Sequence, residues 1–500
     1  MTNSANKNIF RSIDWVTVII YVAFVIWGWV TICSASYNFD NPNIFGLDSN
    51  SGKQLLWIGI AFFVGSILLV IEKRIFEMYS NFFYWLFIAI LLITLVIAPE
   101  TKGSRSWIPI GFMKLQPAEF AKFSVALALG HLIDKLGFSM SNKKDAWKAA
   151  ALILLPMAII ILQRETGSAL VYLAFFLVLY REGMSGSVLF YFFMAIVYFV
   201  VGVRFSDDLF LNEAVSIGEF SVLLLAQVSI TLLTKYVCRN DFAAKWMAVI
   251  GLGVTFILFL FSAFVIPFDF TAIMLLICLA QVGYLTYLGI NTRLSRYYIV
   301  AAFAFFSAVS FYISDFMLDR LEKHQRVRIE VLLGKKSDKM GAEYNVNQAK
   351  IAIGSGGFEG KGFLKGTQTK LRYVPEQETD FIFCTIGEEG GFLQSVLLLI
   401  AYAFFIWRLI MLAERQPDTP GRVYGYSVAC IFLFHLFINV GMVLGLTPVI
   451  GIPLPFFSYG GSSLIMQLFE AGLLLNISRH DYRSRSELEE AELRKAAGLD

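Results

Sequence analysis

Charged residues are scarce in this chain of 500 residues. Asp, Glu, Lys and Arg make up 16% of the sequence, whereas hydrophobic residues make up 57% and the mean hydropathy is +0.66. Soluble domains are about a quarter charged, so this composition excludes an ordinary soluble protein. Apolar runs of about 20 residues fit membrane-spanning helices better than the short alternating strands of membrane barrels. The sequence therefore predicts an all-α polytopic membrane protein.

Paired cysteines and a cleavable leader are also missing. No CxxC pair links the five scattered cysteines, which argues against a disulfide framework or a cysteine metal site: Cys33, Cys238, Cys278, Cys384 and Cys430. No small-residue cleavage site precedes the first apolar run, so residues 15–33 are expected to form a retained helix.

Fourteen apolar segments are long enough to count as predicted membrane spans. The fifth and sixth are separated only by Arg164 and Glu165, so one broken helix is an alternative there. The segments lie near 14–34, 54–71, 78–98, 117–135, 147–162, 166–181, 187–203, 219–237, 246–266, 270–290, 297–317, 380–412, 423–446 and 457–477.

The positions of Lys and Arg predict the orientation of these spans. Basic residues gather in alternate connections, whereas the intervening connections include the acidic stretch 206–214 and the charge-poor stretch 266–270. Lys and Arg are enriched in cytoplasmic loops. We therefore expect both termini in the cytoplasm and the long polar stretch 319–379 outside. The C-terminal tail 479–500 is expected to be a short, mixed-charge cytoplasmic helix.

The outer stretch 319–379 is the most polar part of the chain. It carries twelve Lys and Arg against eight Asp and Glu, which favours an anionic ligand. Disorder is an alternative for a loop of this length, but regularly placed Ile, Phe, Leu and Tyr argue against it. Its glycines, in GSGGFEGKG at 354–362, would let the backbone approach a ligand closely, with Lys361 supplying charge. The spacing is not that of a P-loop.

Two further outer pieces carry candidate residues. The first, at 99–123, contains five side chains near the membrane interface: Arg105, Trp107, Gln116, Glu119 and Lys122. Trp107 is either an interfacial anchor or a substrate contact, and Glu119 with Lys122 is either an i,i+3 ion pair or part of a site. The second, at 447–464, is rich in proline and glycine and predicts a broken or re-entrant entry to the last span.

Several of these stretches together match one family. They are WIPIG at 107–111, QPAE at 116–119, HQRVRI at 324–329, SDKMGAEY at 337–344, the stretch 348–368 ending in GTQ, VPEQETDFIF at 374–383, and the stretch 441–463 ending in FFSYGGSS. The chain resembles the SEDS proteins (shape, elongation, division and sporulation), also called the FtsW/RodA/SpoVE family. The GKG and GTQ forms resemble the RodA branch.

The sequence departs from the family pattern in four places. SEDS proteins have ten spans, so the resemblance implies about four extra helices, placed at 185–300. QRETGS at 163–168 replaces the usual QPDxGT, ETDF at 378–381 replaces HTDF, and Ala118 replaces a serine. The expected domains are an N-terminal membrane half at 1–184, the inserted helices at 185–300, a C-terminal half at 301–478 with the outer loop 319–379, and the tail at 479–500.

The resemblance implies a peptidoglycan glycosyltransferase that polymerises lipid II on the outer face of the bacterial cytoplasmic (inner) membrane. The essential aspartate of the family corresponds to Asp338. As general base it would deprotonate the 4-hydroxyl of the acceptor sugar, and fixed positive charge would stabilise the pyrophosphate leaving group. The expected substrate-binding residues are Arg105, Trp107, Glu119, Lys122, Arg326, Arg328 and Lys361. Asp380, Glu388 and Glu389 compete with Asp338 as candidate carboxylates.

No ligand cluster in the sequence demands a metal, although a divalent cation (Mg or Mn) is a possible cofactor. A class B penicillin-binding protein is implied as the transpeptidase partner by the resemblance alone. Two other functions stay open at this point. A lipid II flippase would suit many spans with intramembrane charges, and a non-catalytic scaffold for wall synthesis would tolerate neutral substitution of Asp338.

Overall fold

The chain folds into helices that divide into two compact units. The structure, a computed structural model, describes residues 13–38, 42–101, 103–111, 113–211, 213–321, 323–336 and 341–496. Unit 1 combines Met1–Ser185 with Tyr344–Asp500, and unit 2 is Gly186–Glu343. Each unit is described by itself below. The predicted boundaries at 184 and 300 stay predictions. Residue 300 lies within the helix Ser295–Arg320, which belongs to unit 2.

Unit 1 contains most of the helices and one short hairpin. Its elements are α1 (Trp15–Ser36), α2 (Asn50–Val70), α3 (Lys73–Met78), α4 (Ser80–Ile97), β1 (Ile108–Ile110), β2 (Met113–Leu115), α5 (Pro117–Ile133), α6 (Lys143–Leu162), α7 (Thr166–Val171), a 3₁₀ turn (Tyr172–Ala174), α8 (Phe175–Arg181), α16 (Ala342–Gly356), α17 (Thr367–Lys370), α18 (Ile382–Glu414), α19 (Thr419–Leu444) and α20 (Gly461–Ala496). Strands β1 and β2 pair antiparallel.

Local sequence signals fix where several of these helices begin and end. The side chains of Ser49 and Asp418 accept hydrogen bonds from the backbone N–H groups of Gly52 and Gly421 and so cap α2 and α19. Gly445 ends α19 in the left-handed region at φ 71°. Arg164, also at positive φ, separates α6 from α7. Helices α6 and α7 are therefore separate, and their assignment to two membrane spans stays a prediction.

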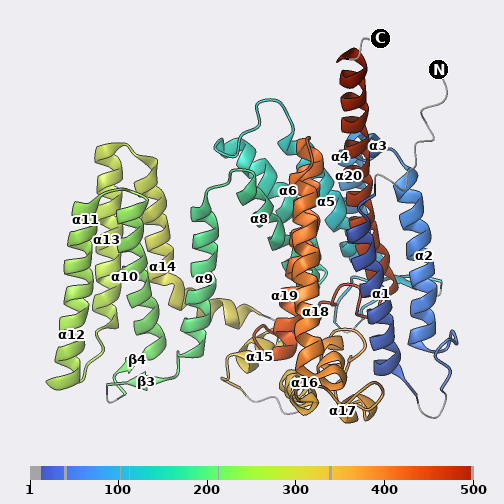
Figure 1. Cartoon of the computed structure of the whole chain (residues 1–500). Coiled ribbons are helices and arrows are strands. Elements are labelled where there is room, and N and C mark those ends of the chain that lie inside the picture. The colour runs from blue at the N-terminus through green and yellow to red at the C-terminus, as the bar shows by residue number, and fades with distance from the viewer. Residues whose placement is uncertain are drawn as a thin grey trace. The chain divides into compact units, whose positions relative to one another are not determined.

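The helices of unit 1 pack around α5, α18 and α19. In Figure 1, α18 lies beside α19, and α5 packs against α4 and α19. The irregular stretch between Leu444 and Gly461 lies inside this bundle. Phe456 contacts the rings of Tyr21 and Phe432 at centroid distances of 5.0 and 5.2 Å. The predicted broken entry to the last span is thus non-helical backbone packed in protein, where such backbone is tolerated at membrane depth.

Unit 2 is a smaller helical bundle. It contains α9 (Gly186–Arg204), β3 (Leu209–Phe210), β4 (Val215–Ser216), α10 (Ile217–Tyr236), α11 (Asp241–Met247), a π-helical turn (Ala248–Leu252), α12 (Gly253–Phe264), α13 (Thr271–Thr292), α14 (Ser295–Arg320) and α15 (Lys323–Leu332). Strands β3 and β4 form an antiparallel hairpin. Helix α14 packs against α9, α10 and α13.

The helical fold agrees with the all-α membrane protein that the sequence predicts. Within the described ranges, eleven helices are long and apolar enough to cross a membrane by length and composition. The other three predicted spans correspond to α5, the shorter apolar helix Thr166–Arg181, and α20. The chain is therefore a multi-pass membrane protein, and the total of fourteen spans stays a prediction.

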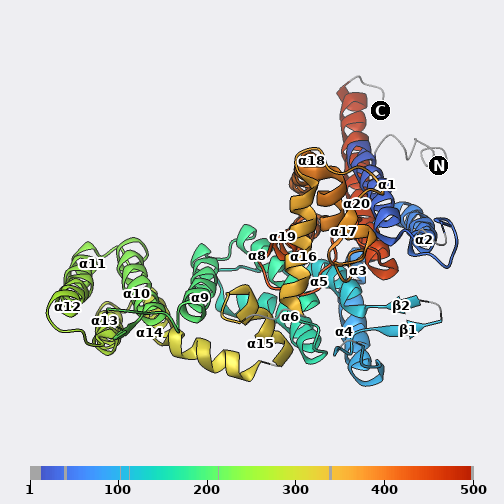
Figure 2. The same ribbon diagram turned by 90° about the horizontal axis from the view of Figure 1, so that it is seen from below.

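The polar stretch 319–379 is largely helical where the structure describes it. It contains α15, α16 and α17. Figures 1 and 2 show α16 and α17 against one end of α18. Asp338 falls within 337–340, outside the described residues. The predicted tail helix continues α20 without a break as far as Ala496.

Candidate functional site

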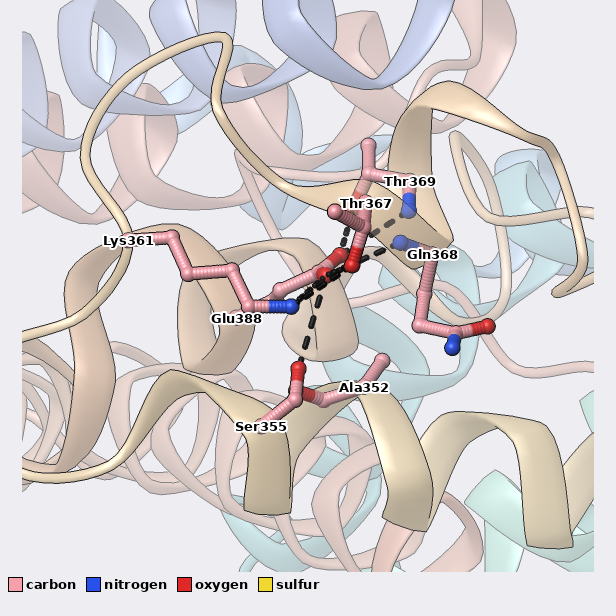
Figure 3. Close-up of polar contacts among 7 residues, drawn as sticks. All are labelled: Ala352, Ser355, Lys361, Thr367, Gln368, Thr369 and Glu388. Atoms are coloured by element: carbon pink, nitrogen blue, oxygen red, sulfur yellow. Dashed lines mark hydrogen bonds and ion pairs between the residues drawn. The ribbon is translucent and has the colours of Figure 1, made fainter.

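A buried carboxylate near the start of α18 organises the described part of the polar stretch 319–379. The side chain of Glu388 has no exposed surface. As Figure 3 shows, donors from the segment 361–369 and from α16 converge on it. Its Oε1 accepts from Lys361 Nζ at 2.7 Å, Gln368 N at 2.9 Å, Thr367 Oγ1 at 3.2 Å and Ser355 Oγ at 3.5 Å; its Oε2 accepts from Thr369 N at 2.9 Å and Thr369 Oγ1 at 2.7 Å.

This arrangement explains how a charge is tolerated in the interior. A buried carboxylate is costly unless it is paired and hydrogen-bonded, and Glu388 has both an ammonium partner and several neutral donors. With both oxygens engaged, Glu388 is suited to anchor the segment 361–369 rather than to accept a proton from a substrate. The neighbouring Glu389 accepts a hydrogen bond from Ser34 on α1.

Glycines bring the backbone of the polar stretch onto α18. A Cβ atom added to Gly356 would lie 2.0 Å from the carbonyl oxygen of Gly387, and one added to Gly360 would lie 2.2 Å from that of Glu389. Lys361 N donates to the carbonyl of Glu388 at 3.0 Å. Gly391 leaves helical geometry at φ 66° and makes room for this contact. At these two positions the close approach is to the protein's own backbone, not to a ligand.

A second charged cluster lies deeper in unit 1, between α5 and α19. Lys122 Nζ lies 2.9 Å from Glu119 Oε2 and 2.9 Å from His435 Nε2. The side chains of Lys122 and Glu119 are only 2% and 3% exposed. His435 Nδ1 lies 3.1 Å from the carbonyl oxygen of Pro453, in the irregular stretch before α20. The cluster therefore ties two helices to that stretch.

Comparison with known proteins identifies the family. A family model for cell cycle proteins of the FtsW, RodA and SpoVE type matches residues 14–216 and 218–483. The chain belongs to this family. The resemblance read from the sequence is confirmed.

The relatives are named for wall synthesis. Over 483 residues the chain is 26% identical to the peptidoglycan glycosyltransferase MrdB of Escherichia coli, covering 96% of this chain and 98% of MrdB. It is 31% identical over 429 residues to the peptidoglycan glycosyltransferase RodA of Treponema pallidum, covering 85% and 89%. These names support the predicted enzyme class.

Solved structures share the fold. One, described as a peptidoglycan synthase complex that coordinates polymerization and crosslinking, matches with a TM-score of 0.59 at 22% identity and covers 94% of this chain and 98% of that one. The rod shape determining protein RodA of Thermus thermophilus matches with a TM-score of 0.51 at 20% identity, covering 95% and 99%. At these identities the likeness supports the helical membrane fold.

The predicted substrate-binding residues fall into different settings. Arg105 is half exposed, with Glu100 as an ion-pair partner at 3.7 Å, and Trp107 is half-buried just before β1. Glu119 and Lys122 pair with each other inside unit 1, as the i,i+3 alternative described. Lys361 pairs with Glu388. Their roles in binding substrate stay predictions.

The remaining two predicted residues lie on α15 in unit 2. Arg326 Nε donates to Glu330 Oε1 at 2.6 Å, one helical turn away. Arg328 is partly buried on the same helix. Among the described residues no three His, Cys, Asp or Glu side chains gather in a way that could hold a metal ion. The possible divalent cation thus stays a prediction.

Sequence reasoning missed two partners. His435 lies 313 positions from Lys122, and no local pattern links them. The sequence also indicated Glu388 only as a candidate catalytic carboxylate that competes with Asp338, and not as the anchor of the segment 361–369. The glycine-rich run followed by Lys361 and by the GEEGG sequence at 387–391 was the available signal, since closely spaced glycines often mark contact between two backbones.

Proposed function

We propose that this chain is a peptidoglycan glycosyltransferase that polymerises lipid II into β-1,4-linked glycan strands during cell elongation and rod-shape maintenance. The observation that carries the proposal is the match of the family over nearly the whole chain, to relatives named for this activity. The folded outer stretch supports it, because a scaffold or a simple connection would not require a buried, fully bonded carboxylate to shape it.

The active site faces outward in this proposal, and both termini are cytoplasmic. The distribution of Lys and Arg supports this orientation. So does unit 1, in which α1 begins and α20 ends at one end of the bundle while α16 and α17 lie at the other (Figure 1). The bacterial cytoplasmic membrane would then present lipid II laterally, with its lipid tail between the spans and its headgroup at the outer stretch.

Asp338 acts as general base in the proposed reaction. It takes the proton from the 4-hydroxyl of the acceptor sugar, and that oxygen attacks the anomeric carbon of the donor. The bond from that carbon to the pyrophosphate oxygen breaks, the anomeric carbon is inverted, and undecaprenyl diphosphate leaves with the bonding electron pair. General-base catalysis supplies about 10²–10⁴ in rate, so charge stabilisation of the leaving group must contribute as well.

Arginine suits that second task, because its guanidinium binds phosphate oxygens in pairs. Arg105, Arg326 and Arg328 are the proposed partners of the pyrophosphate. Arg105 is 54% exposed and its partner Glu100 lies at 3.7 Å, so this weak pair exchanges readily for a phosphate. Lys361 contributes by holding the segment 361–369 on α18, and Trp107 packs against the substrate.

A class B penicillin-binding protein is the proposed partner. One structural relative is described as a synthase complex for polymerization and crosslinking. A glycosyltransferase that only polymerises needs a separate transpeptidase to crosslink its product.

The test is polymerisation of labelled lipid II by the purified chain, with and without its partner. We compare wild type with Asp338→Ala and with Glu359→Gln, a matched exposed carboxylate of the same outer stretch. Glycan chains from wild type and from Glu359→Gln, but none from an equally folded Asp338→Ala, would support the proposal. Equal chain growth by Asp338→Ala would exclude Asp338 as the base. Transport of lipid II across liposomes without chain growth would replace the transferase by a flippase.

A further inference from the structure

A cavity of about 310 Å³ lies in unit 1, at the end of the bundle where α19 begins. Its walls come from the last turn of α5, the connection 138–141 that follows, the residues directly after α8, and the first turn of α19. In Figure 1 this end of unit 1 is opposite the end that carries α16 and α17. A volume above about 300 Å³ is enough to hold a small-molecule ligand or a headgroup.

One charged side chain at this cavity keeps unused hydrogen-bond donors. Arg422 donates from Nε to Glu182 Oε1 at 3.1 Å and from Nη2 to Glu182 Oε2 at 2.9 Å. Both residues line the cavity, and their side chains are 28% and 7% exposed. Within the described ranges the third nitrogen of Arg422, Nη1, has no hydrogen-bond partner. The cavity wall therefore carries a fixed guanidinium group that can still donate to a ligand.

The rest of the wall combines hydroxyl groups with apolar side chains. Ser139, Ser141 and Thr419 line the cavity. Ser139 Oγ accepts from the backbone N–H of Ser141 at 3.3 Å, which leaves its own O–H free to donate. The apolar part of the wall consists of Ile133, Phe138 and Met140. This mixture suits a polar, anionic group that is attached to hydrocarbon.

The surroundings of the cavity resemble the headgroup level of a membrane. Trp147 near the start of α6 and Tyr180 at the end of α8 are both largely exposed, and these two residue types are enriched at membrane interfaces. The connection 134–148 carries four lysines against two aspartates. Basic pockets between helices on the cytoplasmic side bind the headgroups of anionic lipids. The excess of positive charge favours an anionic lipid over a zwitterionic one.

We propose that this cavity binds the phosphate of an anionic phospholipid of the inner leaflet, with Arg422 as its principal ligand. A guanidinium binds phosphate oxygens in pairs. The carboxylate of Glu182 repels a phosphate, but both of its oxygens are held by Arg422, so the lipid shares this arginine with it. The binding does not depend on the proposed reaction, which takes place at the other end of unit 1.

Native mass spectrometry of the purified full chain in detergent tests the class of ligand. The probes are dioctanoyl phosphatidylglycerol, dioctanoyl phosphatidylcholine and inorganic phosphate. We expect phosphatidylglycerol to be retained in preference to phosphatidylcholine, and inorganic phosphate at equal concentration not to displace it. Equal retention of the two lipids would overturn the anionic preference. Displacement by inorganic phosphate would assign the cavity to a free phosphate and overturn the lipid assignment.

Two variants of the same ion pair separate lipid binding from a purely structural role. Arg422→Gln and Glu182→Gln both break the pair, so both destabilise the fold, but they change the charge of the cavity in opposite directions. We expect the Kd for phosphatidylglycerol to rise about tenfold to a hundredfold in Arg422→Gln and to fall in Glu182→Gln. The matched control is Arg181→Gln, because Arg181 pairs with Glu414 at 2.9 Å and does not line the cavity.

The control should bind phosphatidylglycerol like wild type, and thermal unfolding without lipid verifies that each variant is folded. If Arg422→Gln does not fold, Ser141→Asp supplies the test: it adds negative charge at an exposed position of the wall, leaves the ion pair intact and should weaken binding. Wild-type affinity in folded Arg422→Gln or in Ser141→Asp, or an equal loss in Arg181→Gln, would overturn the inference and leave the proposed function standing.

Discussion

Lys361 and Glu388 form an ion pair at 2.7 Å in which the carboxylate side chain has no exposed surface and the lysine side chain keeps 25% of its own. The two residues come from different parts of unit 1, the glycine-rich run of the polar stretch 319–379 and the start of α18. Thr369 binds the same carboxylate with its backbone and its hydroxyl. The pair therefore fixes a polar segment at the end of a membrane helix.

Replacing Glu388 by glutamine is expected to destabilise the protein by about 3–5 kcal/mol, as removal of one partner from a buried ion pair does. The amide nitrogen would replace one of the two carboxylate oxygens and would face either Lys361 Nζ or Thr369 N, each of which is itself a donor. Lys361→Met should cost less, about 1.5–3 kcal/mol, because the carboxylate keeps its neutral donors. Unfolding in detergent measures both.

Lys365→Met is the control for the lysine variant. Lys365 lies four residues on in the same segment and is exposed. The Lys365→Met protein should unfold like wild type. A Lys361→Met protein that is equally stable would show that the ion pair does not anchor the segment.

A pair of glycines in α16 offers a sharper test of the contact with α18. Gly356→Ala would place a Cβ atom 2.0 Å from the backbone oxygen of Gly387, so one backbone must move. Such overpacking costs about 1–3 kcal/mol. Gly354→Ala adds the same methyl group to the same helix with no atom within 4 Å, and should be neutral or stabilise by about 0.5–1 kcal/mol. Equal unfolding midpoints for the two variants would contradict the described contact.

Local patterns predicted the helices well and the tertiary contacts poorly, for a physical reason. Apolar runs fix helices because the bilayer demands internal backbone hydrogen bonds, and the i,i+3 spacing of Glu119 and Lys122 correctly suggested their ion pair. The glycines of the polar stretch were expected to approach a ligand, yet Gly356 approaches α18. The same residue type serves either contact, so only the fold decides between them.

The contact between Lys335 and Asp207 should make the stability of unit 2 depend on pH. The pKa of Asp207 is lowered because Lys335 and Ser206 donate hydrogen bonds to its carboxylate, while burial opposes this. A lowered pKa in the folded state means that the stabilisation is complete above the ordinary value of 3.8 and is lost as the pH falls through the folded value.

Because the Asp207 carboxylate is largely exposed, its contact with Lys335 contributes only about 0.2–1 kcal/mol to the free energy of unfolding. Denaturant unfolding of wild type and Asp207→Asn should therefore differ by that amount near about pH 7 and converge in acid. A difference in the free energy of unfolding between the two proteins that grows toward low pH would contradict this prediction.

The pair of Lys122 and Glu119 lends itself to a double-mutant cycle. Both side chains are almost fully buried, and Lys122 is shared with His435. Removing one charge leaves the other buried without its partner, so Lys122→Met and Glu119→Gln should each cost about 3–5 kcal/mol. Removing both leaves no uncompensated charge, and the double variant should be more stable than the sum of the single effects predicts. Unfolding in detergent gives the coupling energy, and strict additivity would mean that the two charges do not stabilise each other.

The same variants assayed with lipid II would separate a role in the fold from a role in binding substrate. A double variant that is stable but inactive would support a direct part for this pair in binding substrate. A double variant that regains both stability and activity would confine the pair to the fold.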